Sequence, residues 1–214
     1  MADDSIAGLK SRTVTFGRRS IFVTELGEGY PVIMLHGGGP GASGLSNYGR
    51  NIQALAQRFR VIVPDLQGYG RSSKGVDRKD PFGDLAEAML GLMDALKIRR
   101  AHLVGNSLGG ACALRMALDQ PARVSALVLM GPGGIGTTRA LPTRGLNLLL
   151  NYYGGSGPSR DKLARFIRDY LVYDGSRVED AIIDARYQSS MNRFSLEGIS
   201  SILMGKFGGG SPLL

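Results

Sequence analysis

The stretch Ala101-His102-Leu103-Val104-Gly105-Asn106-Ser107-Leu108-Gly109-Gly110-Ala111 decides the fold. Its first four residues form an apolar run typical of a buried strand, and a helical pattern follows from 108 to 119. Between them lies the pattern G-x-S-x-G, in which small residues let a strand and a helix approach while the serine occupies a strained turn. A plain glycine turn with a capping serine is the alternative. The strand before and the helix after favour Ser107 as a nucleophile, with backbone N–H groups of the helix start facing a developing oxyanion.

A glycine-rich loop follows an earlier apolar run. Residues 31–35 are typical of a buried strand, and His36-Gly37-Gly38-Gly39-Pro40-Gly41 comes directly after them. Glycines let a backbone approach a substrate oxygen closely, so this loop can supply a second N–H group to an oxyanion hole. The alternative is a phosphate-binding loop. It is disfavoured because no Gly-Lys-Ser/Thr ending and no complete dinucleotide-binding pattern are present.

The remaining periodicity predicts an α/β protein with a mostly parallel sheet. Strands are expected at 13–16, 20–26, 31–35, 60–63, 101–104 and 124–130, the first two forming a hairpin, with helices at 47–57, 83–97 and 108–119. After Met130 only helical segments are expected, at about 146–152, 160–171, 178–190 and 195–204. We therefore predict a core over residues 1–135, which stops after its sixth strand, and a helical lid over residues 136–214.

The composition disfavours nucleic-acid-binding, secreted and membrane proteins. The 214 residues carry a net charge of +8, shared evenly between the two halves, with acidic residues interleaved throughout. No basic run contains aromatic residues, so nucleic-acid binding is not expected. A single cysteine, Cys112, no secretory signal and no apolar run long enough for a membrane predict a cytoplasmic protein. We expect no metal and no cofactor, because neither a ligand cluster nor a cofactor motif is apparent.

Taken together, these motifs resemble the α/β-hydrolase superfamily and, within it, the meta-cleavage-product hydrolases. These enzymes hydrolyse a carbon–carbon bond in bacterial degradation of aromatic compounds and steroid rings. The resemblance runs from about residue 12 to the end of the chain. It is carried by the loop from His36 to Gly41 with Ser46-Asn47-Tyr48, by the elbow from Val104 to Gly110, and by Leu129-Met130-Gly131-Pro132-Gly133-Gly134.

The resemblance implies a role for each matching residue. Ser107 would be the nucleophile, and the N–H groups of Gly38 and Leu108 would form the oxyanion hole. Asn47, Asn106 and Arg186 would hold the carboxylate of a 2-hydroxy-6-oxohexa-2,4-dienoate and its neighbouring oxygen, since an arginine fork suits a carboxylate. Two alternatives stay open. Asn47 could be a helix N-cap, and Arg186 could be a surface arginine paired with an acid such as Asp180 or Asp184.

The sequence also departs from the family. A serine hydrolase of this kind needs an acid and then a histidine after the serine, yet the only histidines, His36 and His102, precede Ser107. Both are expected to be structural, as is Asp65. We interpret the chain as a hydrolase truncated at its C-terminus, in which Ser107 lacks a general base and is a weak nucleophile.

Three hypotheses about function result. The first is a carbon–carbon bond hydrolase whose partner is a small anionic dienoate, and which forms a homo-oligomer when full length. The second is an ordinary carboxylesterase on the same fold, because a fold does not fix its substrate. The third is a non-catalytic binding protein derived from a hydrolase.

Overall fold

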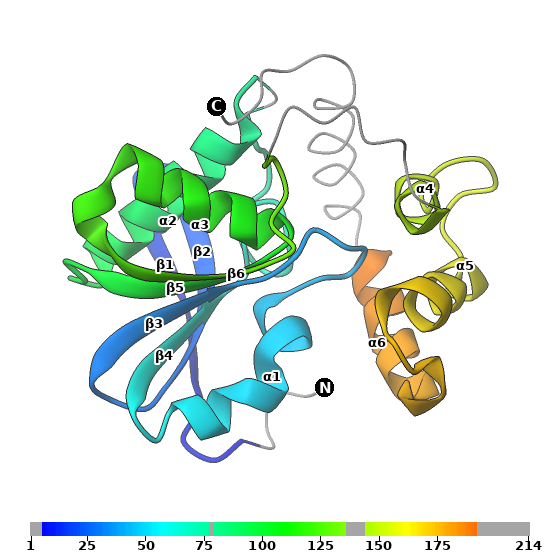
Figure 1. Ribbon diagram of the computed structural model, residues 1–214, viewed down its shortest axis with the longest axis horizontal. Coiled ribbons are helices and arrows are strands. Elements are labelled where there is room, and N and C mark those ends of the chain that lie inside the picture. The colour runs from blue at the N-terminus through cyan, green and yellow to red at the C-terminus, as the bar shows by residue number, and fades with distance from the viewer. Residues whose placement is uncertain (1–5, 78, 136–143, 192–214) are drawn as a thin grey trace.

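A computed structural model describes residues 6–77, 79–135 and 144–191 (Figure 1). Six strands form one sheet in the order β1-β2-β4-β3-β5-β6. Strand β2 pairs antiparallel with β1 and with β4, whereas the pairs β3–β4, β3–β5 and β5–β6 are parallel. The strands are β1 (Lys10–Phe16), β2 (Arg19–Leu26), β3 (Tyr30–Leu35), β4 (Phe59–Pro64), β5 (Ala101–Asn106) and β6 (Val124–Met130).

Alternation along the inner strands sends side chains to two separate cores. On one face, Ile33, Leu35 and Ile62 pack with α2 (Pro81–Ala95) and α3 (Leu108–Asp119). On the other face, strand residues pack with Tyr48 and Ile52 of α1 (Gly44–Leu55). Figure 1 shows α2 and α3 over one side of the sheet and α1 over the other. Both faces of β3 and β4 are therefore covered, which explains their continuous apolar runs.

All six predicted strands and the first three predicted helices are present, and the hairpin of β1 and β2 is confirmed. Several boundaries were wrong by two or three residues, because β1 begins at Lys10 rather than at 13, α1 at Gly44 rather than at 47, and α2 at Pro81 rather than at 83. Ser43 and Ser46 form a capping box, in which each side chain accepts from the other's backbone N–H. Asn47 therefore lies inside the first turn and is not the N-cap.

A group of helices, which we call the lid helices, follows the core. They are α4 (Arg144–Leu150), α5 (Arg160–Phe166), which continues into the π-helical turn η2 (Ile167–Leu171), and α6 (Asp180–Ser190). Their apolar side chains form a third cluster around Tyr152, Leu163 and Ile183. The helix expected at 195–204 lies outside the described residues. None of the described helices combines the length and the hydropathy that crossing a membrane requires.

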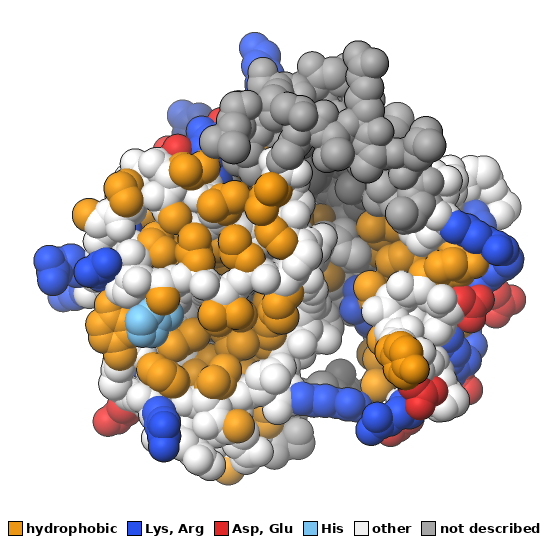
Figure 2. Space-filling model, viewed as in Figure 1, with side chains coloured by type: hydrophobic (Ala, Val, Ile, Leu, Met, Phe, Trp, Pro, Cys, Tyr) orange, Lys and Arg blue, Asp and Glu red, His pale blue; other side chains and the backbone are white. Residues whose placement is uncertain are grey.

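Strand β6 has only one neighbour, β5, among the described strands. Its residues alternate, so that Leu127 and Leu129 pack on the core while the side chains between them face outward. Val128 is 55% exposed and Met130 is 42% exposed. Figure 2 shows hydrophobic side chains gathered over this part of the sheet. The described residues thus leave one face of β6 uncovered.

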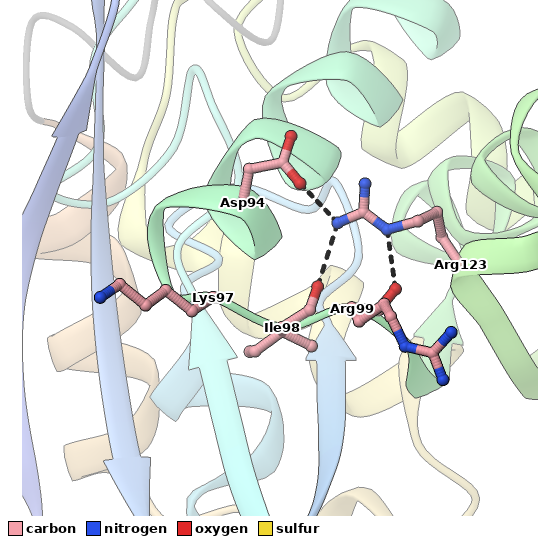
Figure 3. A pocket seen from close by; sticks show the side chains of 5 residues that line it. All are labelled: Asp94, Lys97, Ile98, Arg99 and Arg123. Atoms are coloured by element: carbon pink, nitrogen blue, oxygen red, sulfur yellow. Dashed lines mark hydrogen bonds and ion pairs between the residues drawn. The ribbon is translucent and has the colours of Figure 1, made fainter.

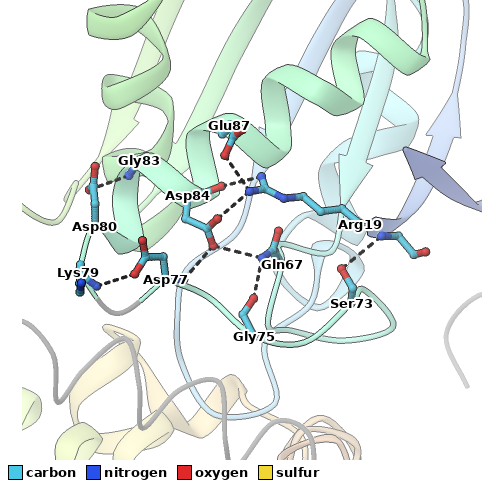
Figure 4. Close-up of polar contacts among 11 residues, drawn as sticks. Arg19, Gln67, Ser73, Gly75, Asp77, Lys79, Asp80, Gly83, Asp84 and Glu87 are labelled. Carbon is cyan, nitrogen blue, oxygen red and sulfur yellow. Dashed lines mark hydrogen bonds and ion pairs between the residues drawn. The ribbon is translucent and has the colours of Figure 1, made fainter. Parts of the chain in front are cut away.

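A polar network holds the long segment between β4 and α2 (Figure 4). Asp84, in the first turn of α2, accepts from Arg19 at 2.7 Å, from the Gln67 amide at 3.2 Å and from the Asp77 backbone N–H at 3.0 Å. Gln67 also donates to the Gly75 carbonyl at 2.6 Å. Through these bonds the Asp84 carboxylate connects the start of β2 with the loop between β4 and α2. They fix the segment that carries Asp65, Leu66 and Tyr69 beside the glycine-rich loop.

Candidate active site

Ser107 occupies a strained turn between β5 and α3. Its φ of 50° and ψ of −111° are unusual for a residue with a side chain, and its side chain is exposed. Hydrogen bonds on both sides hold this conformation, because the Ser107 N–H donates to Met130 O at 2.9 Å and the Gly133 N–H donates to Ser107 O at 2.9 Å. The predicted elbow is therefore present, and the end of β6 supports it.

Replacing Ser107 by glycine should relieve the backbone strain of the turn and so increase the stability of the protein. We expect Ser107→Gly to raise the free energy of unfolding by about 1 kcal/mol, because glycine adopts a positive φ freely. Ser107→Ala keeps the Cβ and should leave stability nearly unchanged. Lys97 is exposed and also has a positive φ, of 56°, so Lys97→Gly serves as the control. It measures how much the free energy of unfolding rises when glycine replaces a residue in an ordinary left-handed conformation. Urea unfolding of the three variants tests this, and equal stability of the glycine and alanine variants at 107 would contradict it.

The glycine-rich loop lies directly against the elbow. A Cβ on Gly37 would be 3.5 Å from the Ser107 Cβ, and a Cβ on Gly38 would be 3.1 Å from the Leu108 side chain. The structure thus brings together Gly38 and Leu108, the two residues expected to form an oxyanion hole. Leu108 is the first residue of α3, where backbone N–H groups have no partner within the helix. The arrangement can present two N–H groups beside the Ser107 hydroxyl.

His36 fixes the orientation of this loop. Its ring is fully buried, its Nε2 accepts from the Leu66 N–H at 2.9 Å, and its Nδ1 lies 2.8 Å from the Gly37 carbonyl. Because Nε2 accepts, Nδ1 carries the proton and donates to that carbonyl. In a trans peptide the N–H points opposite to the C=O, so this bond sets the direction of the Gly38 N–H. His36 therefore has a structural role, as the sequence predicted.

The burial of His36 should make stability depend on pH. Burial lowers the pKa of His36 below its ordinary value of about 6.5, and nearby Arg186 lowers it further, while the Gly37 carbonyl and Asp65 raise it. The unfolded chain then binds a proton at a higher pH than the folded chain does. Stability is therefore full above pH 6.5 and falls below it, by up to about 1.4 kcal/mol per pH unit for one proton.

Urea unfolding between pH 7 and pH 5 measures this slope. The matched control is His102→Gln, which should keep the slope, while His36→Gln should lose it. A wild-type stability that stays constant over this range would show that protonation of His36 does not oppose folding.

Both asparagines predicted to bind substrate lie beside the loop. The Asn47 side-chain oxygen accepts from the Gly37 N–H at 3.3 Å, and its amide donates to Ser43 O at 3.3 Å. A Cβ on Gly37 would be 3.4 Å from the Asn106 amide nitrogen. The two amides therefore approach Gly37 from different elements, α1 and the end of β5. This contact with the glycine-rich loop distinguishes Asn47 from an ordinary residue of the first helical turn.

Arg186 reaches the same loop from α6. Its Nε and Nη2 donate to Pro40 O at 3.3 and 3.0 Å, and a Cβ on Gly39 would be 3.1 Å from Nη2. Asp180 and Asp184 pair instead with Arg160, so the alternative of a surface pair for Arg186 is wrong. Burial lowers the pKa of Arg186, which Tyr153 and Tyr152 oppose. Arginine has five N–H donors, so this guanidinium can still bind a carboxylate.

Neither His102 nor Asp65 can act with Ser107. The His102 ring contacts Tyr30 in a tilted arrangement and Phe59 edge-on at the start of β5, and it lies five positions before the serine, roughly 16 Å along an extended strand. Asp65 is buried, and its two carboxylate oxygens accept from the N–H groups of Gly44 and Arg71. Both ring nitrogens of His36 are also occupied. These positions support the expectation that none of the three is the base or acid of a triad.

A separate depression lies at the opposite end of the sheet (Figure 3). It is lined by Asp94, Lys97, Ile98, Arg99 and Arg123, near the start of β5. Arg123 crosses it and donates to Asp94 at 2.6 Å and to two backbone carbonyls, those of Ile98 and Arg99, at 3.0 and 2.8 Å. These bonds join α2 to the segment before β6. We assign the depression a structural role, since ligands of such sheets bind at the carboxyl ends of the strands.

Three tyrosines whose side chains lie near the glycine-rich loop received no role from the sequence, although Tyr48 is part of the stretch that resembles the family. Tyr69 donates to Gly38 O at 3.3 Å, and Tyr48 donates to Leu35 O at 2.9 Å, with burial raising the pKa of Tyr48 to about 12. The Tyr153 hydroxyl is buried and has no hydrogen-bond partner among the described residues. Only the contacts made in three dimensions identify these residues. Cys112, in contrast, is fully buried in α3, and burial raises the pKa of its thiol.

Comparison with known proteins agrees with this geometry. The family described as alpha/beta hydrolase fold matches residues 30–154. The chain is 44% identical over 172 residues to a 2-hydroxy-6-oxo-6-phenylhexa-2,4-dienoate hydrolase of Comamonas testosteroni, covering 79% of the chain and 59% of that protein. It is 43% identical to a 2-hydroxy-6-oxononadienedioate/2-hydroxy-6-oxononatrienedioate hydrolase of a Pseudomonas species, covering 81% and 62%. The chain thus spans about three fifths of the length of these curated relatives.

Solved structures of meta-cleavage product hydrolases are also similar to this chain. The meta-cleavage product hydrolase of Pseudomonas fluorescens IP01 superposes with a TM-score of 0.79 at 35% identity, over 89% of the chain and 67% of that protein. The 2-hydroxy-6-oxo-6-phenylhexa-2,4-dienoate hydrolase of a Rhodococcus species superposes with a TM-score of 0.81 at 29% identity, over 94% and 73%. A serine at a strand-to-helix elbow beside a glycine-rich loop defines the fold class. The chain belongs to the α/β-hydrolase fold family, and within it the chain is similar to the meta-cleavage-product hydrolases named above.

Proposed function

We propose that this protein acts in the hydrolysis of a carbon–carbon bond in 2-hydroxy-6-oxo-dienoates formed by cleavage of aromatic rings. The single observation that carries the proposal is that Arg186 of the lid helices reaches the same glycine-rich loop that packs against Ser107. A cation at one end of the site suits the carboxylate of the ligand. A serine with two N–H groups at the other end suits its 6-carbonyl.

Each residue then has a role in this proposal. Arg186, Asn47 and Asn106 hold the carboxylate and its neighbouring oxygen. Transfer of the 2-hydroxyl proton to C5 gives a 2-ketone conjugated with a C3=C4 double bond, which provides an electron sink for the breaking C5–C6 bond. Ser107 attacks the 6-carbonyl and, in this chain, loses its hydroxyl proton to solvent water, and the oxyanion that forms accepts hydrogen bonds from the N–H groups of Gly38 and Leu108. Hydrolysis then releases an acid and 2-hydroxypentadienoate. The lid helices, within residues 136–214, close this site over the core of residues 1–135.

The chain of 214 residues is expected to bind the dienoate and to hydrolyse it slowly. Neither histidine can accept the Ser107 proton, since His36 is used in the loop and His102 lies at the far end of β5. A serine without an adjacent base is a weak nucleophile. A non-catalytic role in binding the same ligand is therefore the second candidate for this chain.

The test is a titration of the chain with 2-hydroxy-6-oxo-6-phenylhexa-2,4-dienoate, followed by the absorbance of the conjugated dienoate and by chromatography of the products. Saturable binding with slow release of benzoate supports hydrolysis, and saturable binding without release supports the binding role. A simple aryl ester serves as the comparison substrate. Ester hydrolysis without any dienoate binding would overturn the proposal in favour of an ordinary esterase.

A further inference from the structure

The hydroxyl group of Tyr153 is a buried polar group that the proposed reaction does not use. It has no hydrogen-bond partner among the residues that the structure describes. A buried hydroxyl without a partner is costly, because it has lost water and gained nothing in return. Such a group needs an explanation, and one explanation is that the hydroxyl makes its hydrogen bond to a ligand when the ligand binds.

The position of Tyr153 connects the core to the lid helices. Its ring packs against the core cluster of the sheet and also against the lid cluster around Tyr152. The Tyr152 ring meets it edge-on, with ring centroids 4.6 Å apart. Tyr152 is satisfied, because its hydroxyl lies 2.6 Å from the Ser190 Oγ. Of these two neighbouring tyrosines, only Tyr152 has a hydrogen-bond partner among the described residues.

The surroundings of Tyr153 indicate which ligand group would reach it. Burial lowers the pKa of Arg186, and Tyr153 and Tyr152 both oppose this shift. Burial raises the pKa of Tyr69, and Tyr153 adds to that shift. Both tyrosines therefore lie near the guanidinium, and Tyr153 also lies near Tyr69. Arg186 donates to Pro40 O and Tyr69 donates to Gly38 O, so both neighbours contact the glycine-rich loop. Burial raises the pKa of Tyr153, so the hydroxyl keeps its proton at neutral pH and acts as a donor. An anionic oxygen bound by Arg186 would lie near this donor.

We propose that Tyr153 is a further substrate-binding residue, whose hydroxyl donates a hydrogen bond to the carboxylate end of the ligand held by Arg186. This assignment rests on the proposed function. Tyr153 adds a neutral donor beside the arginine, and binding of the ligand supplies a partner to a hydroxyl that has none among the described residues. The bond would be charge-assisted and therefore stronger than one between neutral groups.

Tyr153→Phe tests this, because it removes only the hydroxyl. We expect the Kd for 2-hydroxy-6-oxo-6-phenylhexa-2,4-dienoate to rise about tenfold or more. The urea midpoint should stay the same or increase, since no existing bond is lost. The control, Tyr152→Phe, removes a partnered hydroxyl, so it should lower the urea midpoint and leave the Kd within twofold. A Kd for Tyr153→Phe within twofold of the wild type would overturn the assignment.

A second ligand tests whether the Tyr153 hydroxyl donates to the carboxylate end of the dienoate. The methyl ester of the same dienoate lacks the negative charge, so the effect of Tyr153→Phe on its Kd should shrink to about twofold. An effect that stays at tenfold would place the hydroxyl away from the carboxylate and would also overturn the assignment. A wild-type chain that binds no dienoate is a different result. It contradicts the proposed function itself before any variant is compared.

Discussion

Gly109→Ala is expected to lower the free energy of unfolding by about 3 kcal/mol, or to prevent folding. A Cβ on Gly109 would meet backbone atoms, namely the Leu35 carbonyl group and, at 2.7 Å, the His36 carbonyl oxygen. Backbone of a central strand cannot move aside as a flexible side chain can. The helix α3 would have to shift away from β3, and Ser107 would shift with it. Since small proteins are stable by only about 5–15 kcal/mol, the loss is a large fraction of the total.

The matched control is Gly49→Ala in α1. Nothing lies within 4 Å of a Cβ placed on Gly49, and the residue is inside a helix. Alanine favours a helix over glycine by about 1 kcal/mol, so this variant should be slightly more stable than the wild type. Urea unfolding measures both variants. A Gly109→Ala protein within 1 kcal/mol of the wild type would show that the elbow tolerates a wider separation of strand and helix.

Arg186→Gln should weaken binding of the dienoate about 100-fold. It removes the cation and the planar fork that match a carboxylate, and truncation of a buried charged partner costs about 2–5 kcal/mol. Arg186→Lys keeps the charge without the fork, so an intermediate loss of about tenfold is expected. The measurement is the absorbance titration with 2-hydroxy-6-oxo-6-phenylhexa-2,4-dienoate.

Arg160→Gln is the control for Arg186, because it removes another arginine that contacts α6. Arg160 pairs with Asp180 and Asp184 and does not contact the glycine-rich loop in the described structure. Its replacement should change the Kd by less than twofold. If Arg186→Gln also bound the dienoate within threefold of the wild type, the carboxylate would be held elsewhere and the proposed function would lose its main support.

The order of the core elements could be predicted because local patterns decide it. Strands β3 to β6 are apolar runs bounded by turns, and the elbow at Ser107 follows a pattern whose small residues have a steric reason. The start of α1 was misplaced because the capping pair, Ser43 and Ser46, lies within a loop rich in glycine and serine. A capping box of two serines has no glutamate or glutamine to mark it in the sequence.

The site was harder to predict where contacts join distant segments. The sequence suggested Arg186 through its resemblance to a family, yet the carbonyl that it contacts, Pro40 O, lies 146 residues away. Tyr69 and Tyr153 have no local pattern that separates them from core aromatic residues. Their importance depends on what each hydroxyl meets, a carbonyl at 3.3 Å for Tyr69 and no described partner for Tyr153. Sequence periodicity predicts which face of a helix is buried, but it does not predict which atom a single hydroxyl group will contact.

The uncovered face of β6 has a consequence for how this chain behaves in solution. Among the described strands β6 has a neighbour on one side only, so its other edge offers N–H and C=O groups that no described strand pairs, and its adjoining face carries exposed Val128 and Met130. Two copies that pair along this edge would satisfy the backbone groups, and two copies that pack through the exposed face would bury Val128 and Met130, which hydrophobic contact favours. The mean mass in solution should therefore rise with protein concentration. A charged residue at 128, introduced as Val128→Lys, should return the chain to the monomer without touching Ser107.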